Sequence, residues 1–171
     1  MSRRRQGREL VLGCLYAHFS TGQEPEAVFD AQAARVTYDA DTVAYARRIY
    51  AKAIAEGEKI DRTIREAATH WDFARIGAVE KNVLRAAIAE LWFCPETPAR
   101  VIMDEAVELT KQYAGAESGA FVNGILDSVY KRSDATPPTA GRSAERRPRQ
   151  EKNPGRKPAR KTVGRTGSGR T

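Results

Sequence analysis

The sequence predicts an all-α fold for residues 1–132 and a disordered basic tail for residues 133–171. Apolar residues recur at the 3.6-residue spacing of an amphipathic helix through nearly all of the first part. No stretch of that part alternates apolar and polar residues for long enough to form a strand. Beyond Tyr130 there is no aromatic residue and only Val163 among the large aliphatic residues, while prolines are frequent. Such a tail cannot bury enough apolar surface to offset the entropy of ordering it.

The first two helices follow from local signals. An apolar stripe begins at Arg8 and ends near Gly22, as expected for an amphipathic helix that a glycine terminates. Pro25 suits the first turn of a short second helix. Its apolar residues Val28 and Phe29 are expected to face the core.

Two further helices are predicted in the middle of the helical part. Asp41 is a candidate N-cap, because its side chain can accept a hydrogen bond from a backbone N–H of the first turn. The stripe that follows reaches Ile54 and weakens around Gly57. A fourth stripe continues at helical spacing from Ile60 to Trp71.

The last three helices complete an expected compact bundle of about seven. A stripe over residues 79–92 stops at Pro95, and Pro98 stands at the start of the next helix, which extends to Tyr113. A final stripe covers residues 121–130. A domain of this length buries about two thirds of the surface of its extended chain, so the seven stripes are sufficient for a hydrophobic core.

The positive charge of the chain is unevenly distributed. Its 29 lysines and arginines outnumber its 22 acidic residues, which gives a formal net charge of +7. Residues 133–171 hold eleven of these bases and three of the acids, so the tail carries +8 and residues 1–132 carry −1. A basic total suggests a nucleic-acid partner, but the total charge does not place that partner on the helical part.

The sequence lacks the motifs of common enzyme and metal sites. There is no HExxH, no paired CxxC, no glycine-rich phosphate loop and no GxSxG. The only histidines, His18 and His70, have no cysteine or carboxylate at ligand spacing. Glu105 and Glu108 lie one helical turn apart and are expected to form a solvated helix face. We therefore expect a protein without catalytic residues, bound metal or cofactor.

The apolar stretches are short and broken by charge, which argues against a membrane span. The N-terminus lacks the cleavage site of a signal peptide. Two cysteines, Cys14 and Cys94, are too few for a disulfide framework and are expected to be buried thiols. Together these features predict a cytoplasmic protein.

Four arginines open the first helix: Arg3, Arg4, Arg5 and Arg8. The helix macrodipole disfavours cations at this end, so another interaction has to compensate, and a phosphate group suits guanidinium geometry. Neutralising four phosphates of a single strand would give a salt dependence with a slope near −3. The alternative is a frayed N-terminus that only confers solubility.

The segment from Gly115 to Asp127 is the second candidate functional feature. Glu117 or Ser118 can cap the last helix. Phe121 lies near the start of this helix, and periodicity alone favours a place in the core. Its alternative role is a stacking platform for an unpaired base. A third feature, Trp71 with the nearby Arg75 and Ile76, is expected to form a structural hinge between two helical halves.

Several of these segments, in their order and spacing, resemble the NusB family of bacterial transcription antitermination factors. The resemblance covers nearly all of residues 3–132. Its motifs are RRRQGRE at 3–9 with Leu15-Tyr16, the segment from Trp71 to Leu91, and Pro98 to Lys111 followed by FVNGILD at 121–127. The glycine at position 7, which interrupts the arginine run, departs from the family pattern.

The resemblance implies a bundle of two subdomains, with three helices and then four. It also implies binding of the single-stranded boxA element of nascent RNA together with the ribosomal protein NusE. That complex joins RNA polymerase with other Nus factors and suppresses premature termination, chiefly on ribosomal RNA operons. Members of such a family occur as monomers or homodimers.

Particular residues match the family's contact positions. Glu80 falls where the family contacts NusE. The RNA contacts carry over to Arg4, Arg5, Arg8, Glu117 and Phe121.

Two alternative functions stay open from the sequence. One is a NusB-like RNA-binding module related to the N-terminal domain of ribosomal RNA cytosine methyltransferases. The other is a non-specific nucleic-acid binder that acts through its basic tail.

Overall fold

The computed structural model describes residues 2–133, and these residues form helices without any strand. The predicted all-α fold is confirmed, and residues 134–171, which make up nearly all of the predicted tail, lie outside the described residues. The elements are α1 (Arg3–Thr21), α2 (Pro25–Ala33), α3 (Ala40–Ala55), α4 (Gly57–Ala67), the 3₁₀ turn η1 (Phe73–Arg75), α5 (Ala78–Phe93), α6 (Ala99–Ala114) and α7 (Ala116–Ser133).

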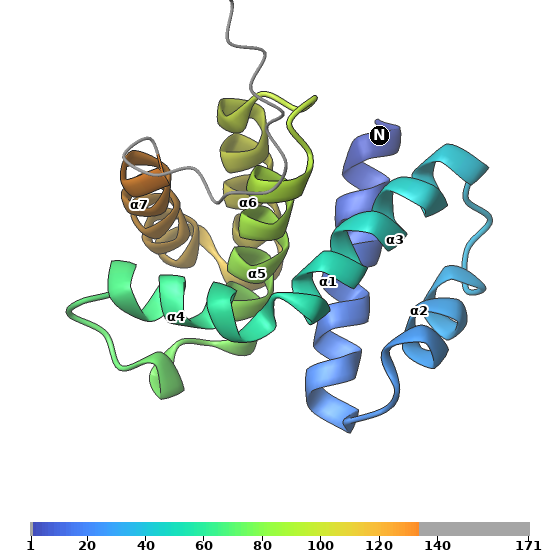
Figure 1. Ribbon diagram of the computed structural model, residues 1–171, viewed down its shortest axis with the longest axis horizontal. Helices are drawn as coiled ribbons and strands as arrows, with labels where there is room; N and C mark the ends of the chain where they lie inside the picture. The colour runs from blue at the N-terminus through green and yellow to red at the C-terminus, as the bar shows by residue number, and fades with distance from the viewer. Residues whose placement is uncertain (1, 134–171) are drawn as a thin grey trace, which may run out of the picture. The chain divides into compact units, whose positions relative to one another are not determined.

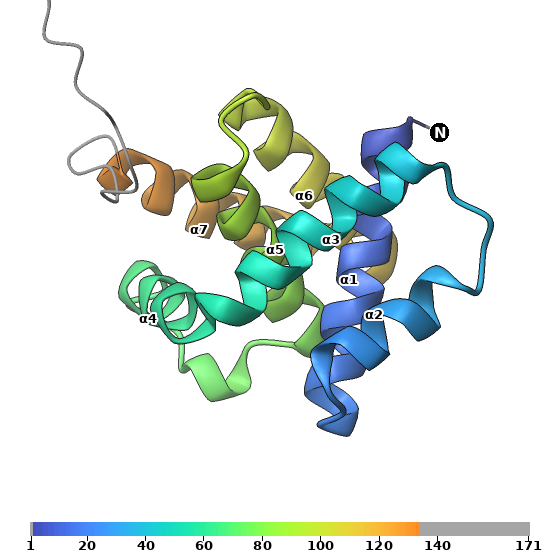
Figure 2. The same cartoon turned by 45° about the vertical axis from the view of Figure 1, so that its right-hand side comes forward.

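Helices α1–α3 pack together and α4–α7 pack together, in the predicted order of three and then four. Figure 1 shows the first group on the right and the second on the left. Helix α5 contacts α1 and α3 as well as α4, α6 and α7, so it lies at the centre of the core. Figure 2 shows α3 crossing α1 beside α5. Both cysteines are buried, as predicted.

Two glycines with positive φ end helices, the first of them where the sequence predicted a helix end. Gly22 has a φ of 68°, and its N–H donates to the carbonyl of His18 at 2.8 Å. Gly115, with a φ of 94°, lies between α6 and α7. Other residues adopt such positive φ values only at a steric cost. Helix α1 starts earlier than its apolar stripe, because the Ser2 hydroxyl accepts a hydrogen bond from the Arg5 N–H.

Three local predictions were wrong. The N-cap of α3 is Asp39, whose carboxylate accepts from the Thr42 N–H at 3.0 Å, and Asp41 lies in the first turn. Helix α7 begins at Ala116, so Glu117 and Ser118 belong to its first turn and do not cap it. Helix α4 ends at Ala67, which leaves Trp71 outside the helix and 62% exposed instead of on an inward stripe.

No helix among the described residues combines the length and apolar character that a membrane crossing requires.

Candidate nucleic-acid interface

The four N-terminal arginines of α1 have different surroundings. Arg5 donates to Glu105 Oε2 at 3.2 Å and to Gln112 Oε1 at 2.8 Å, both on α6. It also pairs with Glu9 one turn along α1. The prediction of a purely solvated Glu105 was wrong, because this carboxylate receives Arg5 and lies 3.8 Å from Arg8. These contacts offset the unfavourable placement of cations at a helix start.

Arg8 is buried inside the bundle. Its Nε and Nη2 donate to the two carboxylate oxygens of Glu90 on α5, at 2.9 and 2.7 Å, in a bidentate pair. The Arg8 side chain is 7% exposed and that of Glu90 is 2% exposed. Burial alone would lower the pKa of Arg8, but the hydrogen bonds and negative charge of Glu90 outweigh it and raise that pKa. Arg8 therefore stays charged and joins α1 to α5.

Tyr45 of α3 completes this buried network. Its hydroxyl donates to Glu90 Oε1, which also receives Arg8. Burial, reinforced by the charge of Glu90, raises the pKa of Tyr45 above its ordinary value. The ring lies so close to α1 that a Cβ on residue 7 would be 2.7 Å from Tyr45 Cδ1. Gly7 thus provides the space in which Tyr45 reaches Glu90.

The guanidinium of Arg4 lies over one face of the Tyr45 ring. The Arg4 guanidinium carbon lies 4.0 Å from the ring centroid, in a cation–π contact. Among the described residues, no carboxylate pairs with this guanidinium. By contrast, Arg3 pairs with Asp39 and Asp41 at 3.4 and 3.7 Å. Arg4 is therefore the N-terminal arginine whose charge is available to a ligand.

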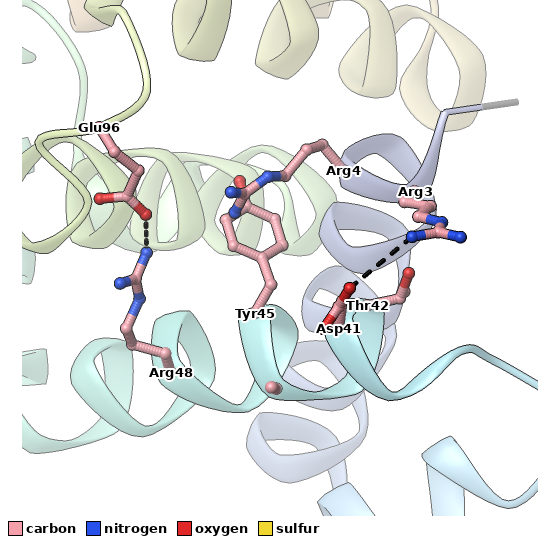
Figure 3. A pocket seen from close by; sticks show the side chains of 8 residues that line it. Arg3, Arg4, Asp41, Thr42, Tyr45, Arg48 and Glu96 are labelled. Carbon is pink, nitrogen blue, oxygen red and sulfur yellow. Dashed lines mark hydrogen bonds and ion pairs between the residues drawn. The ribbon is translucent and has the colours of Figure 1, made fainter.

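A cavity of about 600 Å³ opens beside Arg4. Figure 3 shows Arg4 over Tyr45, with the Arg3–Asp41 pair on one side and the Arg48–Glu96 pair on the other. The hydrogen bond from Arg48 helps to lower the pKa of Glu96, after the larger effect of a backbone hydrogen bond. The cavity is lined by Arg3, Arg4, Asp41, Thr42, Ala44, Tyr45, Arg48 and Glu96.

A second cavity, of about 210 Å³, lies where the turn before α5 meets the first turn of α7. Ser118 donates its hydroxyl hydrogen to Glu80 Oε1 at 2.7 Å across this junction. The Phe121 and Trp71 rings meet edge to face, with centroids 5.2 Å apart. The cavity is lined by Trp71, Arg75, Ile76, Gly77, Glu80, Glu117, Ser118 and Phe121.

Phe121 lies partly against the hydrophobic core and partly at the second cavity. It is half-buried and packs against the hydrophobic core, which accounts for the helical periodicity of its position. It also lines the second cavity together with Glu117 and Glu80. Three of the predicted contact residues thus meet in one place. Arg4 lines the other cavity, while Arg5 lines neither and Arg8 lies in the bundle interior.

Sequence reasoning missed several residues of these cavities. Tyr45 and Arg48 line the first cavity from α3, and nothing in their spacing indicates that they face α1. Arg75 lines the second, although Trp71, Arg75 and Ile76 were predicted only as a hinge. The departure at Gly7 was a usable signal, because a glycine inside a helix often marks a close approach.

Over the described residues, the fold and its two cavities define a class: an all-helical protein that presents a guanidinium without an ion-pair partner in one cavity and aromatic and acidic groups in the other. The chain belongs to the NusB family, whose model matches residues 5–131. It is 36% identical to transcription antitermination protein NusB of Desulfatibacillum aliphaticivorans over 130 residues, which are 76% of this chain and 91% of that protein. It is 40% identical to the NusB protein of Sorangium cellulosum over 129 residues, 75% of this chain and 92% of the relative.

Solved structures agree with this assignment. The fold is similar to a chain from the crystal structure of the antitermination factors NusB and NusE in complex with dsRNA. That match has a TM-score of 0.71 and 30% identity, and it covers 77% of this chain and 98% of the other. NusB of T. maritima matches with a TM-score of 0.69 and 34% identity, over 77% and 92% of the two chains.

Proposed function

We propose that this protein is a transcription antitermination factor that binds boxA-type single-stranded RNA together with the ribosomal protein NusE. In this function it joins the RNA polymerase elongation complex with other Nus factors and suppresses premature termination, chiefly on ribosomal RNA operons. Membership of the NusB family supports the function as a whole. The observation that carries it is the guanidinium of Arg4, held over Tyr45 at the edge of an open cavity.

The chemistry of the two cavities suits different parts of an RNA strand. Arg4 offers a positive charge and several N–H donors to a phosphate. Glu117 is exposed and negatively charged, so it repels phosphate but can accept hydrogen bonds from the amino groups of bases. Phe121 offers an aromatic edge or face for stacking. Glu80, whose carboxylate is positioned by Ser118, is the proposed contact for NusE.

Within this proposal Arg5 and Arg8 hold the N-terminal end of α1, which binds RNA, in position against the rest of the bundle. Their guanidinium groups tie α1 to α6 and α5, so the position of Arg4 depends on them. A direct RNA contact by either residue stays a prediction.

We propose that the protein binds its partners without catalysing a reaction and that it acts in the cytoplasm. We also propose that it consists of a helical domain of residues 1–132 and a tail of residues 133–171. Among the described residues, no group of three or more histidine, cysteine or acidic side chains is placed to hold a metal ion. Family membership supports a regulatory role.

The test is a binding measurement with the full chain, using boxA RNA and a scrambled RNA of equal length and composition, with and without NusE. Phe121→Ala is expected to weaken boxA binding by roughly 1–3 kcal/mol, the value of one stacked base. Arg4→Ala is expected to reduce the slope of log K against log salt by about 0.7, the contribution of one phosphate contact. Arg100→Ala is the matched control, because its side chain is 91% exposed and lies on α6 outside both cavities.

Equal affinity for boxA and scrambled RNA, in the presence and absence of NusE, would contradict the proposed function. Unchanged boxA binding by both variants, with circular dichroism confirming their fold, would contradict the proposed sites.

A further inference from the structure

Trp71 is a large exposed aromatic residue at the mouth of the second cavity. It lies in the turn after α4, where its backbone N–H donates to the carbonyl of Ala68 at 2.9 Å. This bond anchors the turn while 62% of the residue stays exposed. The contact with Phe121 is edge to face, with an angle of 68° between the rings. The contact fixes Trp71 against α7 and leaves much of the indole uncovered.

Arg75 lies four residues further on and lines the same cavity. It is exposed, and within residues 2–133 no carboxylate lies within ion-pairing distance of its guanidinium. The carboxylate of Glu80 is turned back over the start of α5, where a Cβ on Gly77 would be 2.2 Å from Glu80 Oε2. There Glu80 accepts the Ser118 hydroxyl. Arg75 thus has no ion-pair partner within residues 2–133, in a cavity that it shares with the exposed Trp71 ring and the carboxylates of Glu80 and Glu117.

We propose that Trp71 and Arg75 bind one nucleotide of a single-stranded RNA, with the base stacked on the indole and its phosphate held by the guanidinium. The inference rests on the proposed RNA-binding function and adds two residues to its site. The unpaired base is the ligand that suits this set, because a base within a duplex has both faces covered by its neighbours.

The remaining lining residues are compatible with a base in this place. Glu117, which is exposed at the cavity, can accept from an exocyclic amino group of adenine, cytosine or guanine. Phe121 packs edge to face against the indole, so the two rings form one continuous aromatic surface. Stacking would then come from the turn before η1, phosphate pairing from the end of η1 and amino-group recognition from the first turn of α7.

Tryptophan fluorescence tests the stacking directly. The chain has two tryptophans, so the full-length Trp92→Phe variant leaves Trp71 as the single tryptophan. Trp92 is half-buried on α5, where phenylalanine retains an aromatic ring. We expect titration with a single-stranded boxA oligonucleotide to quench the Trp71 emission, and a fully paired duplex of the same sequence to leave it nearly unchanged.

Two substitutions test the energetic role of each side chain. Trp71→Ala is expected to raise the Kd for boxA RNA by about 5- to 150-fold, which corresponds to one stacked base, while Trp71→Phe recovers most of the affinity. Arg75→Gln is expected to reduce the salt slope by about 0.7, and Arg75→Lys to preserve it. Arg35→Gln, which removes an exposed charge in the segment between α2 and α3, is the control and leaves the slope unchanged.

The outcomes separate this inference from the function on which it rests. If Phe121→Ala and Arg4→Ala weaken boxA binding while Trp71→Ala does not, and Trp71 emission is unaffected by RNA, the nucleotide site is wrong and the RNA-binding function stands. If Trp71 emission responds to NusE alone and Trp71→Ala weakens only NusE binding, the cavity is a protein contact and the inference is overturned. If all three variants bind RNA normally, the proposed sites fail together.

Discussion

At the scale of single residues, ion pairing decides which arginines are available to a ligand. Arg8 is committed to Glu90 inside the bundle, and Arg5 to Glu105 and Gln112 at its edge. Within the described residues Arg4 has no ion-pair partner; its guanidinium lies over the Tyr45 ring, and its charge acts on Glu96 across the cavity. The same residue type within one short segment therefore serves two purposes: internal cross-links and an open cation.

The Arg8–Glu90 pair leads to a prediction about stability. Glu90→Gln removes the bidentate counter-charge of the buried Arg8 and leaves it only the Glu105 carboxylate, 3.8 Å away. We therefore expect the free energy of unfolding to fall by about 3–5 kcal/mol. Urea unfolding followed by circular dichroism measures the change. Glu108→Gln, which breaks an exposed pair with Lys111 on α6, is the control and should leave the urea midpoint nearly unchanged. A loss no larger than that of the control would show that the buried pair does not hold α1 against α5.

At the scale of elements, the approach of α3 to α1 builds the first cavity. Gly7 removes the side chain that would collide with Tyr45. Tyr45 in turn carries Arg4 on its ring and donates to Glu90 through its hydroxyl. Gly7 lowers the helix propensity of α1, but it permits the packing of Tyr45 that positions Arg4.

Two glycines in α1 allow a matched test of this role. A Cβ at position 13 would lie near only Gln32 Oε1, at 3.8 Å, an ordinary contact distance. Gly13→Ala should therefore raise the free energy of unfolding by about 0.5–1 kcal/mol through its higher helix propensity. Gly7→Ala places its Cβ 2.7 Å from the Tyr45 ring. We expect this clash to outweigh the gain in helix propensity, so that the free energy of unfolding falls. Gly7→Ala should also weaken boxA binding, because the platform beneath Arg4 shifts. Equal stabilisation by both substitutions would contradict the role assigned to Gly7.

At the scale of the whole molecule, charge is divided between the helical part and the tail. Residues 1–132 carry a net −1 and residues 133–171 carry +8. Within the helical part many bases are paired with acids, so little of its positive charge is available for long-range attraction. Sequence preference should therefore come from local contacts in the helical part, and sequence-independent attraction from the tail.

A chain that ends at Ser133, the last residue of α7, tests this division. It should still prefer boxA over scrambled RNA. Two phosphate contacts, from Arg4 and Arg75, would give a single-strand salt slope of about −1.4, shallower than the value near −3 that four free arginines would give. The full chain should have a steeper slope. Loss of the boxA preference on truncation would place recognition in the tail instead.

The helices and most of their boundaries were predictable, because the signals are local. Apolar periodicity, Pro25, Pro98, Gly22 and Gly115 act through neighbouring residues, and the structure follows them. The N-cap of α3 was misplaced by two residues because two aspartates, at positions 39 and 41, offer the same capping chemistry.

The sequence by itself determined the all-helical fold and drew attention to the arginine cluster, to Glu80 and to the segment around Phe121. Only the tertiary structure decided which arginine is free and which aromatic rings share a cavity. Arg8 pairs with Glu90, which is 82 residues away in the sequence, and Arg5 pairs with Glu105, which is 100 residues away. Pairing at such separations depends on how the helices pack, and apolar periodicity specifies the buried face of each helix but not the partner that this face meets.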